Sequence, residues 1–378
     1  MSNAIIIAQA LADEFRSRAA EYDRTGAFPV ENYARMRQTG YLRAPAPAEL
    51  GGSAASLLEM CRAQQALARG CGSTALAVNM HLFQVGAISD AWRKGQPVET
   101  FLRRVVNDGL ILASNGAESI VVGKWAPSTT AKLTPTGYVV NGRKFFCSQA
   151  PAFDIVRFLA RDVDSDELLL ISAERGAPGL SIDETWDTTG MRASASHDLV
   201  FTNLVVSERA VSARWPAGEP LRTPGLMNVY RWFLPMIASV YLGIAEEARD
   251  EAHCALGKGI NSAQRDEALT DMMLGEMTTA LLTARSVRDQ LVAEINEFPQ
   301  DLDAALSKAI AVKEIVISHS MAAVDKAVEI AGGRSYFRKS PLERLARDAR
   351  AGRFHPPSAP ISYQIIGRRS RERPDDKT

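Results

Sequence analysis

This sequence of 378 residues has few cysteines and no net charge. Lysine plus arginine and aspartate plus glutamate each number 44, so the chain lacks the excess of one sign that draws a protein to DNA or to an anionic membrane surface. We therefore expect no nucleic-acid partner and no membrane partner. The four cysteines form no CxxC pair, which argues against a structural zinc site and favours free thiols in the reducing cytoplasm. They are Cys61, Cys71, Cys147 and Cys254.

Long hydrophobic runs and nucleotide-binding loops are also missing. The longest apolar run, Phe233–Ala245, is too short to span a bilayer and contains Pro235, so it predicts a buried helix. The isoleucines at 5–7 have no basic flank and are followed by Asp13 and Glu14, which is not the pattern of a signal peptide. Neither a GxGxxG nor a Walker loop occurs, and the chain does not alternate strands with helices.

The residue pattern changes twice along the chain, from helical to strand-like and back to helical, which predicts three domains and a tail. Residues 1–109 have apolar residues at helical spacing, and residues 110–215 favour strands and include a hairpin signal. Residues 216–367 contain three long helical segments, while the charged residues 368–378 predict a disordered end. The expected fold class is α+β, with an N-terminal α-helical domain, a middle antiparallel β domain and a C-terminal four-helix bundle.

The last long helical segment ends at a glycine pair, after which the chain turns twice. Its core-facing stripe, which includes Lys313, steps by three and four residues. Gly332 and Gly333 favour the left-handed end of a helix, and Pro341 fits the first turn of the next helix. These turns predict that four side chains of the region lie close together. They are Tyr336, Arg347, Asp348 and His355.

Four short stretches occur in a fixed order along the chain, and each of them is unspecific alone. They are Pro47–Gly52, Asn141–Ser148, Gly190–Ser194 and Gly332–Arg350. In order and spacing, and with the change from helices to strands and back, they resemble the acyl-CoA dehydrogenase superfamily over residues 28–368. The resemblance implies a flavin, FAD or FMN, between the β domain and the bundle, and a homotetramer or homodimer.

The same resemblance assigns residues to the flavin. It implies that Ser148 hydrogen-bonds to flavin N5, where a hydroxyl can donate or accept as N5 gains or loses a proton. Trp125 and Trp186 are candidates to pack near the flavin ring, although an aromatic residue of a β domain more often belongs to the core. The remaining candidates for cofactor binding are Phe146, Asn115, Gly332, Gly333 and Arg334.

The chain departs from the family where the catalytic base should stand. A dehydrogenase of this family removes a proton next to a thioester carbonyl, which needs a carboxylate at the flavin. The two positions that carry this base in the family are occupied here by Pro356 and Phe233, and neither residue accepts a proton. Glu246 and Glu247 lie further along the same helix as Phe233 and are interpreted as partly solvated helix charges.

The contacts that the family makes with the adenine half of FAD are also weakened. Glu329 stands before the glycine pair where the family has glutamine, and a carboxylate there repels a pyrophosphate. Unless Lys258 or Arg334 compensates, we expect a loss of FAD affinity on the order of 1–3 kcal/mol. The loop at 257–261 lacks the arginine and phenylalanine of the family, and Ser335 replaces a third glycine.

These departures favour another branch of the superfamily, the two-component monooxygenases, which bind reduced flavin from a separate reductase and use O₂. Members resemble this chain in a histidine of the buried N-terminal helix, here His81, and in a histidine after the Arg-Asp pair, here His355. A histidine with a pKa near 6.5 can give a proton to oxygen or take one from a substrate. With Ser148 these residues form the predicted catalytic set. The alternatives are a core histidine at His81 and a turn residue at His355.

Three functions therefore stay open. The first is a reduced-flavin and O₂ monooxygenase that acts on a small apolar or amine-bearing metabolite. The second is a dehydrogenase of acyl thioesters with its base at a non-standard position. The third is a flavin-poor structural member without catalysis. None of the three predicts a metal site.

Overall fold

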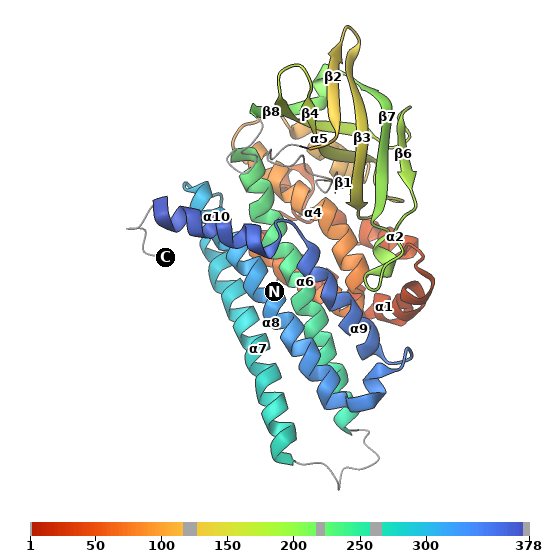
Figure 1. Cartoon of the computed structure of the whole chain (residues 1–378), viewed down its shortest axis with the longest axis vertical. Coiled ribbons are helices and arrows are strands. Elements are labelled where there is room, and N and C mark those ends of the chain that lie inside the picture. The colour runs from red at the N-terminus through yellow and green to blue at the C-terminus, as the bar shows by residue number, and fades with distance from the viewer. Residues whose placement is uncertain (1, 116–126, 217–223, 258–266, 373–378) are drawn as a thin grey trace.

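The computed structural model describes residues 2–115, 127–216, 224–257 and 267–372, with a sheet at one end and helices along the rest of the molecule (Figure 1). The N-terminal helices are α1 (Asn3–Thr25), α2 (Val30–Gln38), α3 (Leu57–Gly70), α4 (Gly72–Arg93) and α5 (Glu99–Asn107). Helix α3 begins with a capping box, because the Ser56 hydroxyl accepts from the Glu59 N–H and the Glu59 carboxylate accepts from the Ser56 N–H. Helix α4 is buried on nearly all sides because it runs between other helices and the sheet.

The middle part of the chain forms one sheet, which has eight strands among the described residues. They are β1 (Leu112–Asn115), β2 (Thr130–Thr134), β3 (Gly137–Cys147), β4 (Ile155–Asp162), β5 (Glu167–Glu174), β6 (Leu180–Asp183), β7 (His197–Val206) and β8 (Val211–Pro216). Their order is β6-β7-β3-β2-β4-β5-β8, with β1 beside β4. The predicted hairpin is confirmed, since β2 pairs with β3 across the turn between Thr134 and Gly137.

The predicted antiparallel β domain is confirmed for most strand pairs, but the pairs that β4 makes with β1 and β2 are parallel, so the sheet is mixed. Strand β4 runs parallel to β1 over Leu112–Asn115 and parallel to β2 at Thr130 and Ala131. The cause is the path of the chain: β3 carries it back past β2, so β4 starts again at the end where β2 started and lies on the other side of β2. The remaining strand pairs are antiparallel.

Three long helices and a short one form the predicted C-terminal bundle. They are α6 (Pro224–Gly257), α7 (Glu267–Glu294), α8 (Leu302–Ala331) and α9 (Pro341–Arg350), with the 3₁₀ turns η7 (Gly332–Tyr336) and η8 (Ala351–Phe354) on either side of α9. Helix α10 (Ala359–Glu372) follows, so the predicted disordered tail is wrong for residues 368–372. Arg369 anchors this helix because it pairs with Asp301 and Asp303 at the start of α8. Residues 373–378 lie outside the described residues.

The N-terminal helices and the bundle share one hydrophobic core, whereas the sheet has a core of its own. Gly243 of α6 allows a close crossing with α3, since a Cβ there would lie 2.1 Å from Gln65 O. Within the described ranges, no helix is long and apolar enough to cross a membrane. The same residues contain no group of His, Cys, Asp or Glu that could hold a metal ion. The four cysteines are free, as predicted.

Candidate functional site

The end of strand β3 carries a chain of three hydroxyl groups. Ser148 directly follows β3, and its Oγ lies 2.8 Å from Ser196 Oγ. Ser196 Oγ lies 2.7 Å from Ser194 Oγ, and all three side chains are buried. A hydroxyl offers one donor and two acceptor positions, so Ser148 can bind Ser196 and still hydrogen-bond to a ligand.

Two aromatic rings accompany these hydroxyls. Phe146, whose carbonyl accepts from Ser148 N, has a left-handed backbone with a φ of 63° and is 60% exposed. Its ring meets that of Trp186 edge-on at 5.9 Å, and Trp186 Nε1 donates to Met191 O. An exposed aromatic residue in a strained conformation points to a ligand contact. Hydroxyls and flat rings together fit the polar edge and the face of a flavin.

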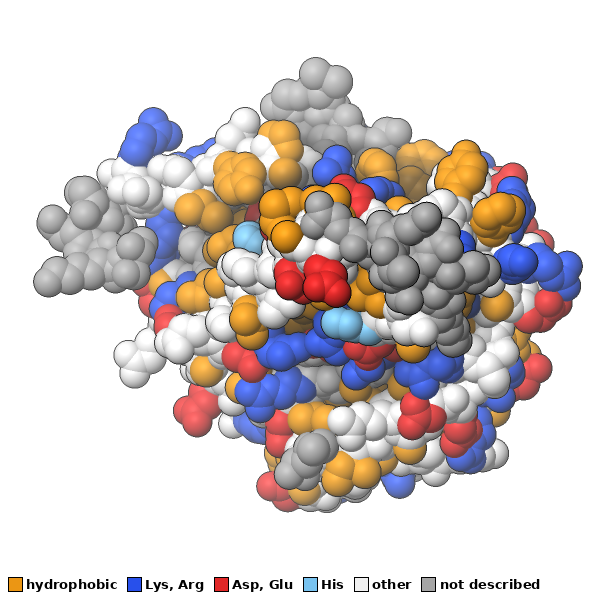
Figure 2. All heavy atoms as spheres, turned by 90° about the horizontal axis from the view of Figure 1, so that it is seen from below, with side chains coloured by type: hydrophobic (Ala, Val, Ile, Leu, Met, Phe, Trp, Pro, Cys, Tyr) orange, Lys and Arg blue, Asp and Glu red, His pale blue; other side chains and the backbone are white. Residues whose placement is uncertain are grey.

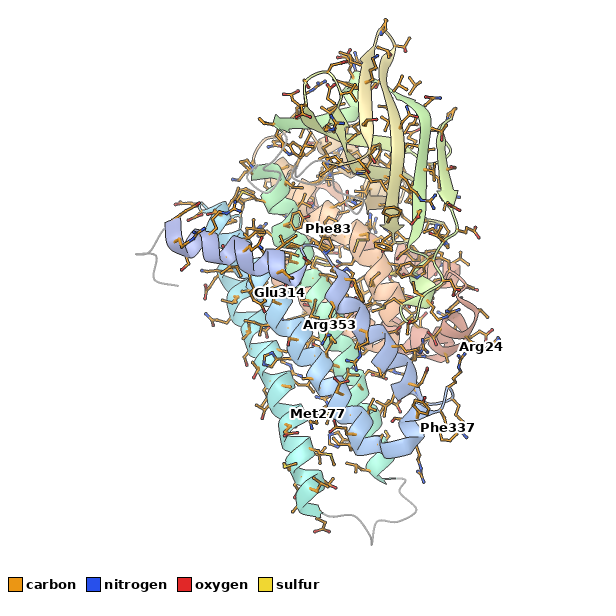
Figure 3. The ribbon with its side chains drawn as sticks, viewed as in Figure 1. Arg24, Phe83, Met277, Glu314, Phe337 and Arg353 are labelled. Carbon is orange, nitrogen blue, oxygen red and sulfur yellow. The ribbon has the colours of Figure 1, made fainter. Side chains whose placement is uncertain are left out.

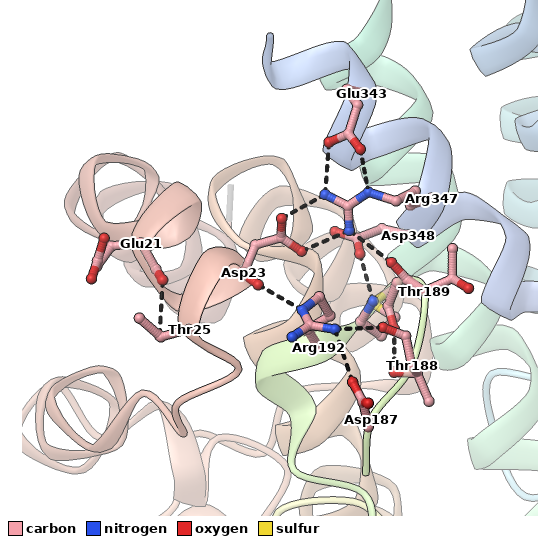
Figure 4. Close-up of polar contacts among 12 residues, drawn as sticks. Glu21, Asp23, Thr25, Asp187, Thr188, Thr189, Arg192, Glu343, Arg347 and Asp348 are labelled. Carbon is pink, nitrogen blue, oxygen red and sulfur yellow. Dashed lines mark hydrogen bonds and ion pairs between the residues drawn. The ribbon is translucent and has the colours of Figure 1, made fainter. Parts of the chain in front are cut away.

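Helix α9 holds the loop that carries two of these serines (Figure 4). Met191 N donates to Asp348 Oδ1 at 2.6 Å, and Ser194 N donates to Met191 O at 3.0 Å. Gly190 permits this close contact, since a Cβ there would lie 2.4 Å from Arg347 O. Burial raises the pKa of Asp348 to about 6, against the opposing effect of the Met191 N–H.

The four side chains predicted to gather after α8 do not do so. Arg347 turns towards α1 and binds Asp23 at 2.6 Å and Glu343 at 2.7 Å (Figure 4). Tyr336 is 89% exposed on η7. Arg347 and Asp348 point to different neighbours because consecutive residues of a helix with 3.6 residues per turn face different directions.

His355 lies in an aromatic cluster between α6 and the segment after α9. Its Nε2 is 2.6 Å from the Tyr241 hydroxyl, and its ring centroid is 6.4 Å from that of Phe233. Phe233 packs in turn against Phe83 at 5.2 Å, and Figure 3 places Phe83 where the helices approach the sheet. Pro356 directly follows His355, so both positions predicted to correspond to the family's base lie near this cluster.

The pKa of His355 lies below the expected value near 6.5, so the ring is neutral at pH 7 and stays neutral in mild acid. Burial, and secondarily the charge of Lys313, lowers the pKa of His355 to about 3. Lys313 Nζ donates to Pro357 O at 2.5 Å and to His355 O at 3.3 Å. Sequence reasoning missed Lys313 and Tyr241 as site residues. Both could have been found as polar groups at apolar positions: Lys313 lies in the apolar stripe of α8, and Tyr241 lies in the long apolar run of α6.

The catalytic role predicted for His81 finds no support in its surroundings. The ring is fully buried, Nδ1 accepts from Leu112 N at 3.1 Å, and Nε2 lies 2.8 Å from Leu42 O. Since Nδ1 accepts, Nε2 carries the proton and donates it to the carbonyl. Burial lowers the pKa of His81 to about 4. Both ring nitrogens bind the backbone, so His81 is the core histidine of the alternative interpretation.

The glycine pair lies at the other end of the bundle. Gly332 and Gly333 follow α8, and no described atom lies within 4 Å of a Cβ built on either residue. Figure 3 places the neighbouring Phe337 at the end away from the sheet. One chain therefore does not bring Gly332, Gly333 and Arg334 together with Ser148. A single cofactor that touches both regions would have to bind between two copies.

Glu329 has a cationic partner that the sequence analysis did not anticipate. Its carboxylate lies 2.8 Å from Lys326 Nζ, which also binds Glu276 at 2.8 Å. Glu276 and then Glu329 raise the pKa of Lys326, so this lysine is charged. Lys326, Glu276 and Glu329 together carry one net negative charge. Arg334, the other possible compensating group, directly follows the glycine pair. Lys258 lies outside the described residues.

Glu246 and Glu247 are buried, which corrects their interpretation as partly solvated charges. Glu246 pairs with Arg285, and Glu247 pairs with Arg16 at 2.9 Å and with Arg69 at 3.5 Å. The arginines explain how two carboxylates are tolerated in a helix that faces the core. Both carboxylates are engaged in these pairs, so neither is a free base.

Three predictions fall on residues whose side chains are not described. Trp125 and the loop at 258–261 lie in the undescribed ranges. Asn115 ends strand β1 opposite Phe158 of β4, but its side chain lies outside the described part of the structure. Their contacts with a flavin stay predictions.

Models of the acyl-CoA dehydrogenase family match the chain in three parts. The N-terminal domain matches residues 6–96, the middle domain residues 122–204, and the C-terminal domain residues 235–357. YdbM of Bacillus subtilis (strain 168), which its name places among the acyl-CoA dehydrogenases, is 32% identical over 354 residues, which cover 92% of this chain and 91% of YdbM. L-evernosamine nitrososynthase of Micromonospora sp. is 31% identical over 356 residues, with 90% of this chain and 83% of that protein covered.

A solved structure is similar over the whole chain. KijD3, in complex with FMN and dTDP-3-amino-2,3,6-trideoxy-4-keto-3-methyl-D-glucose, has a TM-score of 0.88 at 26% identity, and the match covers 100% of this chain and 96% of that chain. The three family domains occur in the order of the helical, sheet and helical parts described above. The three domain matches, and the 32% identity to YdbM over 92% of this chain, show that the chain belongs to the acyl-CoA dehydrogenase family of flavin-dependent oxidoreductases.

Proposed function

We propose that this protein is a flavin-dependent monooxygenase that takes reduced FMN from a separate reductase and uses O₂ to oxygenate a small, amine-bearing metabolite. The observation that carries the proposal is the aromatic cluster at His355. Phe233 and Pro356 occupy the two family positions for the catalytic base, and the Phe233 ring lies against His355. Abstraction of the proton next to a thioester carbonyl needs a carboxylate, and neither position supplies one.

The residues at the end of β3 would hold the flavin ring. Ser148 offers a hydroxyl to the ring edge, while Phe146 and Trp186 offer aromatic surface. When bound, reduced FMN supplies two electrons and activates O₂. FMN lacks the adenylate half of FAD, so its binding does not depend on the distant glycine pair or on the negative charge at Glu329.

His355 and its aromatic neighbours would serve the substrate. A neutral imidazole donates a hydrogen bond and stabilises negative charge on an oxygen atom without carrying a charge itself. The rings of Phe233 and Phe83 make one side of this surrounding apolar, which would strengthen that hydrogen bond.

The names of two relatives suggest the class of substrate. One is named as a nitrososynthase of L-evernosamine, and the other was solved with a nucleotide-linked 3-amino sugar. Both names contain a sugar amine, and identities of 31% and 26% over most of the chain support a related substrate. Nucleotide-linked amino sugars are therefore the first substrates to test.

The proposal is tested with purified protein, a flavin reductase, NADH, FMN and O₂. We expect colourless protein that forms an oxygenated product only when the reductase is present. His355→Ala should uncouple flavin oxidation from product formation while FMN affinity stays near normal, because the ring acts on the substrate side. Unchanged coupling in this variant would remove His355 from the mechanism.

A dehydrogenase of acyl thioesters is the second candidate, favoured by the 32% identity to YdbM. It predicts yellow protein with tightly bound FAD that bleaches anaerobically when an acyl-CoA is added. That outcome would overturn the monooxygenase. Two described carboxylates near the site are already engaged, since Asp348 Oδ1 accepts from Met191 N and Glu314 Oε1 pairs with Lys313 Nζ at 2.7 Å.

A further inference from the structure

Tyr241 and His355 form a hydrogen-bonded pair whose direction follows from its surroundings. The Tyr241 hydroxyl is buried and has no second partner among the described residues. If the hydroxyl accepted from Nε2, its own O–H would be left without an acceptor, which is costly for a buried group. The hydroxyl therefore donates to Nε2. A neutral imidazole has one N–H, so the proton of His355 is on Nδ1.

The Nδ1–H of His355 is available to a bound molecule. The residue is partly exposed, and Nδ1 has no hydrogen-bond partner within the described ranges. The ring next to it belongs to Phe233, which offers no acceptor oxygen. A ligand with an acceptor oxygen would satisfy this donor.

The segment that carries His355 is held in place on two sides. Lys313 donates to the carbonyls of His355 and Pro357, so one buried ammonium group fixes both ends of this short turn. Gly352 of η8 allows the segment to lie close to α8 and α6, since a Cβ there would lie 2.7 Å from Ile317 Cγ2 and 3.3 Å from the Tyr241 ring. The backbone of His355 is therefore fixed independently of its ring.

We propose that Tyr241 is a positioning residue that fixes His355 as a neutral Nδ1–H donor for the oxygen acceptor of a bound ligand. The donor keeps its proton, because the loss of Nδ1–H would require Tyr241 to become a tyrosinate in an apolar surrounding. His355 thus stabilises charge on oxygen by a hydrogen bond rather than by proton transfer. The inference rests on the proposed function for the identity of the acceptor, whereas the tautomer is a property of the protein alone.

The test is NMR of the full chain with ¹⁵N-labelled histidine, of which the sequence has five. The signals of His355 are assigned by their loss in His355→Asn. In the wild type at pH 7 we expect a protonated Nδ1 and an unprotonated Nε2. Tyr241→Phe keeps the ring but removes the hydroxyl, so we expect two tautomers in exchange and severalfold less product per O₂ consumed. Tyr230→Phe is the matched control, because Tyr230 packs on Phe233 of the same cluster, and it should leave the His355 signals unchanged.

Several results would overturn the proposal. One is a protonated Nε2 or a doubly protonated ring in the wild type, which needs no variant. Another is an unchanged tautomer in Tyr241→Phe. A fixed Nδ1–H tautomer together with no O₂-dependent product under any condition would uphold the positioning role and remove the proposed function, so the two failures are distinguishable.

Discussion

Ser148 contributes a single hydroxyl to the candidate flavin site, and this group can be removed without changing the strand that carries it. We expect Ser148→Ala to weaken FMN binding about fivefold, since one hydrogen bond contributes about 1 kcal/mol. Quenching of FMN fluorescence measures the change. Ser194→Ala is the matched control, because the Ser194 hydroxyl is connected to that of Ser148 only through Ser196 and would not touch the flavin. Equal effects in the two variants would mean that Ser148 does not face the flavin.

Asp348 is a buried carboxylate whose raised pKa, about 6, links stability to pH. The unfolded chain releases this proton near pH 4, so Asp348 favours the folded state most below that pH, and the contribution is lost as the pH rises through 6. The loss amounts to about 3 kcal/mol, at 1.36 kcal/mol per pKa unit. Asp348→Asn keeps an acceptor for Met191 N and removes the charge. As the pH rises from 4 to 7, we expect the unfolding free energy of the variant to increase by up to this amount relative to that of the wild type.

The comparison has to be made as a difference between two stability curves. His81 and His355 have lowered pKa values, so each disfavours the folded state as the pH falls below 6.5, opposite in sign to Asp348. Both histidines are present in the wild type and in Asp348→Asn, and their effects cancel in the difference. A difference in unfolding free energy that does not change with pH would contradict the assignment.

At the scale of elements, the crossing of α3 and α6 joins the N-terminal helices to the bundle. Gly243→Ala would place a Cβ 2.1 Å from Gln65 O, and we expect a loss of about 1–3 kcal/mol in unfolding free energy. Gly275→Ala in α7 is the matched control, because no described atom lies within 4 Å of its Cβ. Alanine at position 275 should increase the unfolding free energy by about 0.5–1 kcal/mol. Denaturant unfolding measures both, and equal effects would mean that the crossing is looser than described.

Most element types could be predicted from the sequence, while some pairings could not. Helical periodicity predicted α6, α7 and α8, and the turn at 135–137 predicted the hairpin of β2 and β3, because both signals are local. The parallel pairing of β4 with β1 and β2 depends on residues far apart in sequence, for which a local pattern has no signal. Helix α10 extends into a charged segment because Arg369 finds Asp301 and Asp303, which are distant in sequence.

At the scale of the whole molecule, the candidate flavin site and the glycine pair lie at opposite ends of the bundle. Figure 2 views the end away from the sheet, where hydrophobic side chains are exposed between charged ones. Tyr336, Phe337 and Met272 are exposed on η7, the turn after it and α7. The expected homodimer or homotetramer would cover such side chains, and FAD would need a second copy to supply the glycine pair, whereas FMN would not.

The choice between FMN and FAD can be tested through Glu329. Glu329 shares its lysine partner with Glu276, and a carboxylate at this place repels the pyrophosphate of FAD. We expect Glu329→Gln to strengthen FAD binding by about fivefold or more, on the order of 1 kcal/mol, and to leave FMN binding unchanged. Calorimetric titration with each flavin measures this. A parallel change for both flavins would place Glu329 outside the FAD contacts.

The sequence by itself determined the order of helical, sheet and helical parts, the absence of a carboxylate at positions 233 and 356, and the candidates Ser148, Phe146 and Trp186. These follow from local periodicity and from residue types at fixed spacing. The tertiary structure alone decided which candidates have free polar atoms: His81 is bound to the backbone on both sides, whereas His355 is bound on one side by Tyr241. The physical reason is that burial and hydrogen-bond partners set the proton and the charge of an imidazole, and these come from residues far away in the chain.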